Sequence, residues 1–173
     1  IGTQTLDVVR ENKDNLSVCA ISGNENIELL KNQILEFSPE LCAVMNEANA
    51  IELKKLLPND CRTEIVTKMD GLISAAVYSK AEIVVTAVSG MIGLKPTIEA
   101  IKLGKTIALA NKETLVAGGE YIMNLAKKHK AVILPVDSEH SAIFQSLSSN
   151  KHEEINKLII TASGGPFRGK KLD

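Results

Sequence analysis

Short runs of apolar, β-branched residues alternate with helical segments along almost the whole chain, and this alternation constrains the fold most. The strongest run, residues 83–88, reads IVVTAV and is bounded by Ser89 and Gly90. Continuously apolar strands separated by helices are typical of a parallel sheet covered on both faces. We therefore expect an α/β protein. The predicted strands are 18–21, 41–44, 62–67, 83–88, 106–109, 131–134 and 158–161. The predicted helices are 5–10, 27–35, 50–57, 72–77, 96–103, 114–127 and 142–147.

Composition narrows the class of protein. The chain has 173 residues, of which 45% are hydrophobic and 24% charged, enough for one domain or one domain and the start of another. Its net charge of −1 argues against a nucleic-acid partner or an anionic membrane surface, and no apolar run is long enough to span a bilayer. The three cysteines are dispersed and odd in number, which indicates a reducing, cytoplasmic compartment.

Polar residues gather where the predicted strands end. In open parallel sheets, ligands bind beyond the carboxyl ends of the strands. We therefore expect a binding site at that edge of the sheet. The segments concerned are Ser22-Gly23-Asn24, Val88-Ser89-Gly90, Ala110-Asn111-Lys112-Glu113, Asp137-Ser138-Glu139-His140 and Ser163-Gly164-Gly165.

Two carboxylates, Asp137 and Glu139, follow the apolar run at 131–134 and admit two interpretations. If the backbone stays extended, both point the same way and suit a hard cation such as Mg²⁺ or Mn²⁺. Alternatively, Asp137 or Ser138 caps a helix whose first turn holds Glu139. The stretch by itself favours the cap, and the rest of the chain shifts the balance toward the metal.

The other strand-end segments also have a functional and an ordinary interpretation. Lys112 could hold a substrate oxygen or phosphate, and a cation is unfavourable at the positive end of the next helix, which favours function over a merely solvated turn. The loop at Ser163 could bind phosphate, but Ser-Gly-Gly is also an ordinary turn. The loop at Gly23 could lie near an adenosine ribose or be a simple turn and cap.

Several stretches resemble the 1-deoxy-D-xylulose 5-phosphate reductoisomerase family. They are TIALANKE at 106–113, LPVDSEHSAIFQ at 134–145 and TASGGPFR at 161–168, while residues 1–9 resemble the end of the family's nucleotide-binding loop and the following helix. The resemblance implies rearrangement of 1-deoxy-D-xylulose 5-phosphate, a phosphosugar, and its reduction by NADPH to 2-C-methyl-D-erythritol 4-phosphate. It also implies a requirement for Mg²⁺ or Mn²⁺ and a homodimer.

The resemblance also implies roles for individual residues. Asp137 and Glu139 are metal ligands, and Glu139 also touches the substrate. Lys112 and Ser138 hold the oxygens of the substrate backbone, and Ser163 helps to bind its phosphate. The residues implied to contact NADPH are Ile1, Gly23, Glu25, Asn26, Asn111 and Glu113.

From the resemblance we expect two domains. Residues 1–136 form a Rossmann-like NADPH-binding domain that lacks its first strand and glycine loop, and residues 137–173 open an α+β catalytic domain. We expect this piece alone to be inactive, because it holds only part of the metal and phosphate ligands. Two alternatives remain: a homoserine or aspartate-semialdehyde type of dehydrogenase on the same fold, and a nucleotide-sensing regulatory domain without catalysis.

Overall fold

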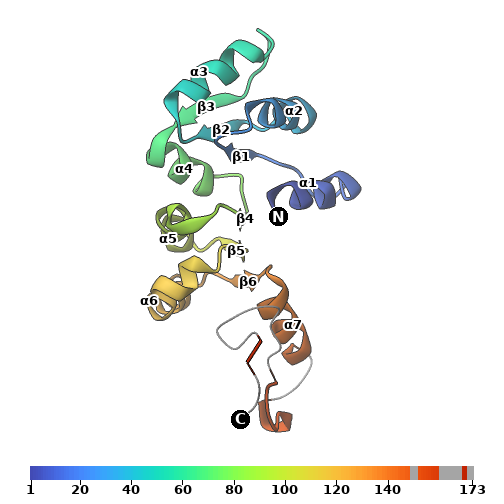
Figure 1. Ribbon diagram of the computed structural model, residues 1–173, viewed down its shortest axis with the longest axis vertical. Coiled ribbons are helices and arrows are strands. Elements are labelled where there is room, and N and C mark those ends of the chain that lie inside the picture. Colours follow the sequence, from blue (N-terminus) through green and yellow to red (C-terminus); the bar gives the residue numbers. More distant parts are fainter. Residues whose placement is uncertain (149–151, 160–168, 171–173) are drawn as a thin grey trace. The chain divides into compact units, whose positions relative to one another are not determined.

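The computed structural model describes residues 1–148, 152–159 and 169–170 (Figure 1). It divides into two compact units, Ile1–Leu134 and Pro135–Asp173, and each is described by itself. Sequence analysis placed the boundary between domains after Val136.

The first unit alternates strands and helices, as predicted. In Figure 1, α1 and α2 lie on one side of the strands, and α4, α5 and α6 lie on the other. The α/β class with parallel strands and helices on both faces is therefore confirmed. The elements are α1 Gly2–Glu11, β1 Ala20–Gly23, α2 Ile27–Phe37, β2 Leu41–Val44, α3 Glu47–Leu56, β3 Glu64–Thr67, α4 Lys68–Ala76, β4 Ile83–Thr86, the 3₁₀ turn η1 Gly90–Gly93, α5 Leu94–Lys102, β5 Thr106–Leu109, α6 Glu113–His129 and β6 Ile133–Pro135.

The strands form two three-stranded sheets rather than one continuous sheet. One has the order β1-β2-β3 and the other the order β4-β5-β6. Within the described residues β1 pairs only with β2, and β4 pairs only with β5, so both are edge strands, as are β3 and β6 at the other edges of the two sheets. Every pair whose register is defined is parallel, with Ala20 opposite Leu41 and Ile83 opposite Thr106.

Each sheet has its own hydrophobic core. Residues of α2, β2 and α3 build the first, in which Ile34, Val44 and Leu53 are almost completely buried. Residues of α5, β5 and α6 build the second, in which Ile101, Ile107 and Ile122 are fully buried. Helix α4 packs against β2 and against α5, so it joins the two sheets within the first unit.

The second unit begins with α7, Ser138–Leu147, followed by a 3₁₀ turn, His152–Glu154. The helix predicted at 142–147 starts four residues earlier because Asp137 caps it. The strand predicted at 158–161 is not formed at Leu158 and Ile159, and its other two residues lie outside the described residues. Within the part of the chain that the structure describes, no helix is long and apolar enough to cross a membrane.

Candidate functional site

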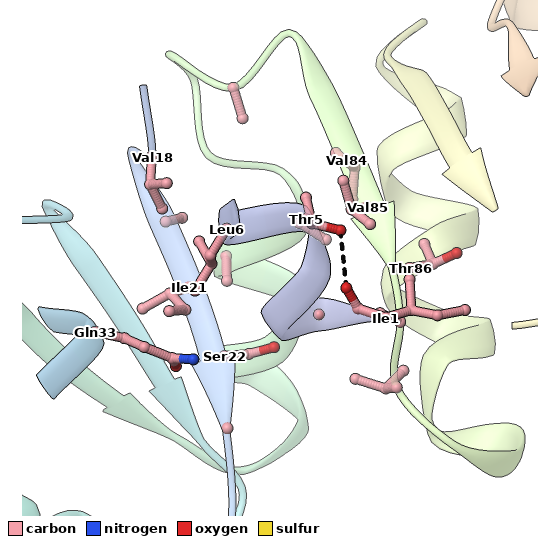
Figure 2. Close-up of a pocket in the computed structure, with 18 of the residues that line it drawn as sticks. Ile1, Thr5, Leu6, Val18, Ile21, Ser22, Gln33, Val84, Val85 and Thr86 are labelled. Carbon is pink, nitrogen blue, oxygen red and sulfur yellow. Dashed lines mark hydrogen bonds between the residues drawn. The ribbon is translucent and has the colours of Figure 1, made fainter. Parts of the chain in front are cut away.

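A groove with a cavity of about 650 Å³ opens between the two sheets (Figure 2). The open edges of β1 and β4 border it, and its lining includes Leu6 of α1 and Ile1, which precedes that helix. Its lining is mostly apolar. Thr86 is among its lining residues, and the buried hydroxyl of Thr86 has no hydrogen-bond partner among the described residues. The groove is therefore bordered by open strand edges and a mostly apolar surface.

Three of the residues predicted to contact NADPH border this groove: Ile1, Gly23 and Asn26. Ile1 precedes α1, Gly23 ends β1, and the Asn26 side chain caps α2 by accepting a 3.0 Å hydrogen bond from the Leu29 N–H. Glu25 is exposed in the loop between β1 and α2. The structure thus places half of this predicted set, Gly23, Glu25 and Asn26, at the carboxyl end of β1.

Asn24 supports the same loop, and sequence analysis assigned it no separate role. Its side-chain oxygen accepts a 3.1 Å hydrogen bond from the Asn46 N–H, and its carbonyl accepts one of 2.6 Å from the Asn49 amide. These bonds fix the loop after β1 to the first turn of α3. Three Asn residues in the two loops were the available signal, because Asn readily bonds to nearby backbone.

Asn111, Lys112 and Glu113 lie at the carboxyl end of β5, where α6 begins. The Lys112 and Glu113 side chains are exposed, whereas Asn111 is 2% exposed. The Asn111 amide donates to the carbonyls of Val88 and Gly90, and its oxygen accepts from Thr114. The loops after β4 and β5 are therefore joined through a buried side chain.

In the second unit, Asp137 is the N-cap of α7. Its Oδ1 accepts a 3.0 Å hydrogen bond from the His140 N–H, and both carboxylate oxygens lie 2.8 Å from His140 Nδ1. Ser138 and Glu139 occupy the first turn, with Ser138 exposed and Glu139 partly buried. The capping interpretation is confirmed, and His140 lies beside the capping carboxylate.

The carboxylate of Asp137 and that of Glu139, two residues further on, are both hard oxygen donors. The donor chemistry of this pair fits Mg²⁺ or Mn²⁺. No group of three or more metal-binding side chains is formed by the residues that the structure describes. Ser163, the predicted phosphate ligand, lies outside the described residues.

Comparison with protein families matches both parts of the chain. Residues 1–119 match the family described as 1-deoxy-D-xylulose 5-phosphate reductoisomerase. Residues 133–173 match the C-terminal domain of 1-deoxy-D-xylulose 5-phosphate reductoisomerase.

Curated relatives carry the same description. The chain is 56% identical over 172 residues to the 1-deoxy-D-xylulose 5-phosphate reductoisomerase of Lachnoclostridium phytofermentans, covering 99% of this chain and 44% of the relative. It is 54% identical over 174 residues to that of Clostridium perfringens, covering 100% of this chain and 45% of the relative. The chain therefore spans less than half the length of these relatives.

Solved structures with the same description are also similar. The enzyme from Zymomonas mobilis in complex with NADPH matches with a TM-score of 0.88 and 36% identity, over 98% of this chain and 44% of that one. A reductoisomerase in complex with NADPH, fosmidomycin and magnesium matches with a TM-score of 0.81 and 36% identity, over 86% of this chain and 36% of that one.

Proposed function

Since this chain belongs to the 1-deoxy-D-xylulose 5-phosphate reductoisomerase family, we propose that the whole protein converts 1-deoxy-D-xylulose 5-phosphate to 2-C-methyl-D-erythritol 4-phosphate with NADPH. The observation that carries the proposal is the match of both family descriptions, one over residues 1–119 and the other over residues 133–173. A homoserine or aspartate-semialdehyde dehydrogenase and a nucleotide-sensing domain are not favoured by these matches.

We propose that NADPH binds at the carboxyl edge of the strands in the first unit. Ile1, Gly23 and Asn26 border the groove, which supports this placement, and Glu25 lies in the same loop. The other two residues that we propose contact NADPH, Asn111 and Glu113, lie at the carboxyl end of β5. NADPH would supply the hydride, while the protein orients the cofactor and excludes water.

We also propose that the groove receives one further strand, which pairs with β1 and β4. The open edges of both strands support this, because a sheet edge leaves N–H and C=O groups without partners. Such a strand would unite the two sheets. Lengthening the chain before Ile1 with the residues that precede this segment in the whole protein should therefore raise its unfolding temperature.

For the substrate half, we propose that Asp137 and Glu139 hold Mg²⁺ or Mn²⁺, with Glu139 also touching the substrate. The cation would supply positive charge that stabilises negative charge on substrate oxygens. Lys112 places a second positive charge on those oxygens, and its exposed side chain supports this role. The hydroxyl of Ser138 donates to the substrate backbone, and Ser163 donates to the phosphate.

We further propose that the protein is a cytoplasmic homodimer. The three cysteines are free thiols rather than disulfides, which supports a reducing compartment. Sedimentation of the full-length protein tests the dimer.

The function is tested by mixing full-length protein, 1-deoxy-D-xylulose 5-phosphate, NADPH and Mg²⁺ and following the loss of NADPH absorbance. We expect turnover that stops when the cation is chelated or when Lys112 is changed to Met, but not when exposed Lys95 is changed to Met. The 173-residue chain by itself should show no turnover.

Two results would contradict the proposal. Turnover with homoserine or aspartate semialdehyde instead of the phosphosugar would identify a dehydrogenase. Nucleotide binding without turnover, indifferent to Lys112→Ala, would identify a sensor.

A further inference from the structure

We propose that Asn111 is a positioning residue that sets where Lys112 stands relative to the loop after β4. The proposal rests on the function proposed above, because it assigns Asn111 a role in presenting Lys112 to the substrate. The resemblance implied a contact between Asn111 and NADPH. The buried side chain indicates a different use, since its hydrogen-bonding groups face the protein.

Every hydrogen-bonding position of the Asn111 side-chain amide is occupied by a partner within the first unit. Its two N–H groups are matched by the carbonyls of Val88 and Gly90, the latter at 2.7 Å. Its oxygen accepts 3.0 Å hydrogen bonds from both the N–H and the hydroxyl of Thr114. A carboxamide has two donors and two acceptor positions, so the side chain has no group left for a cofactor. Any contact of Asn111 with NADPH must come from its backbone.

The loop that Asn111 holds has a demanding geometry. Gly90 has φ +72°, a left-handed conformation that favours glycine. At Gly93 a Cβ atom would lie 2.6 Å from Val88 Cγ2 and 3.3 Å from Asn111 Nδ2. Gly93 and the Asn111 amide therefore form a close-packed joint between the loop after β4 and the loop after β5, and Gly90 supplies the left-handed turn of the first loop.

The Asn111 side chain also supports the start of α6, whose N-cap residue is Lys112. Its oxygen accepts from the Thr114 N–H and so satisfies one of the unpaired N–H groups of the first turn. Lys112 then has helical φ and ψ of −67° and −21°. Its carbonyl accepts from the N–H groups of Leu115 and Val116. The backbone of Lys112 is thus fixed from both sides while its ammonium group remains exposed.

One substitution separates the two roles of the Asn111 amide, which are to accept from Thr114 at the start of α6 and to donate to the loop after β4. Asn111→Asp keeps an oxygen for Thr114, and Asp is as good an N-cap as Asn. The substitution also replaces the NH₂ group by an oxygen that faces the carbonyls of Val88 and Gly90, and oxygens repel one another. It should therefore keep α6 and release the loop after β4.

The kinetic test is a double-mutant cycle in the full-length enzyme with NADPH, Mg²⁺ and 1-deoxy-D-xylulose 5-phosphate. We expect Asn111→Asp to lower kcat/KM by about 100-fold, the loss typical of a group displaced by about 1 Å. In the Lys112→Met background, measured in single turnovers at high enzyme concentration, the same change should alter the rate less than about twofold. Asn124→Asp, on an exposed part of α6, controls for the added charge.

Hydrogen exchange on the 173-residue chain gives a second readout that needs no activity. Asn111→Asp should speed amide exchange at Ser89 and Met91 and leave Thr114 protected. Equal acceleration throughout the first unit would reveal general destabilisation and overturn the proposal. Independent, multiplicative losses in the kinetic cycle would overturn it as well. Absence of turnover in the unmodified enzyme would instead refute the proposed function, and the exchange pattern would still decide whether the joint exists.

Discussion

The carboxylate of Glu40 accepts a 2.8 Å hydrogen bond from the hydroxyl of Tyr78, which lies 38 residues further along the chain. The ammonium of Lys80 donates to both oxygens of the same carboxylate, at 2.7 and 2.8 Å. Lys105 in turn donates to the carbonyl of Tyr78 at 2.7 Å and to that of Ala81. Because these residues precede β2, β4 and β5, the network ties the two sheets together at their amino ends.

This network predicts a pH dependence of stability. The hydrogen bonds from Lys80 and then Tyr78 hold the pKa of Glu40 below its ordinary value. The stabilisation is therefore fully present above the pKa of the unfolded carboxyl and is lost as pH falls through the folded value. Glu40→Gln should lower the urea midpoint at neutral pH and make no difference in strong acid.

The stabilisation that Lys80 and Tyr78 contribute through Glu40 is also lost at high pH. The hydrogen bond to Glu40 raises the pKa of Lys80 and that of Tyr78, so their contribution persists below the unfolded values and disappears above the folded ones. Glu120→Gln, an exposed carboxylate on α6, is the matched control. A difference between Glu40→Gln and the parent that stays constant from acid to alkali would contradict the assignment.

A pair of glycines tests the joint around Asn111 by stability alone. Gly93→Ala would push a methyl group into Val88, and overpacking of this kind costs about 1–3 kcal/mol. Gly119→Ala in α6 meets nothing within 4 Å and should stabilise the chain by roughly 0.5–1 kcal/mol. Thermal and urea unfolding of the two variants should move in opposite directions. Equal effects would mean that Gly93 is not tightly packed.

Local patterning accounts for most of the fold that could be predicted. The strands at 41–44 and 106–109 were predicted with the observed bounds, because each is a continuously apolar run ended by polar residues. Except for α2, whose predicted start at Ile27 is correct, helix starts were predicted too late. Asn46 caps α3 four residues before its first buried residue, Ala50, so the hydrophobic periodicity began after the helix did.

For the candidate site, the sequence predicted only which residues follow the carboxyl ends of the strands. Gly23 and Asn26 border one groove, as the rule for parallel sheets predicts for the loop after β1, whereas Ile1, which also borders it, was implied by the resemblance alone. The four hydrogen bonds of the Asn111 side chain could not be predicted, because they depend on how closely the loop after β4 approaches β5. An Asn three residues before Thr114 was the available hint, since that spacing is typical of a cap.

Buried Cys42 should be the slowest of the three thiols to react. Burial, and then the nearby Cys61, raise the pKa of Cys42 to about 12, so about one thiol in 10,000 is ionised at pH 8. Cys19 and Cys61 are only partly buried. Titration with a disulfide reagent should show one thiol that reacts only on unfolding, and Cys42→Ala should remove that slow phase. A slow phase that survives the substitution would assign it to another cysteine.

Asp137→Asn separates helix capping from metal binding. Asn caps as well as Asp, so circular dichroism should show α7 intact, with the amide oxygen replacing Oδ1 as acceptor for the His140 N–H. Removing the charge removes a ligand, and even groups that merely support a ligand change metal affinity by about 10–100-fold. Calorimetric titration of the full-length protein with Mn²⁺ should therefore show a loss of at least about 100-fold. Asp70→Asn, an exposed carboxylate in the first turn of α4, should bind as the parent does. If Asp137→Asn retains full affinity for Mn²⁺, the carboxylate serves α7 alone and the cation must be bound elsewhere.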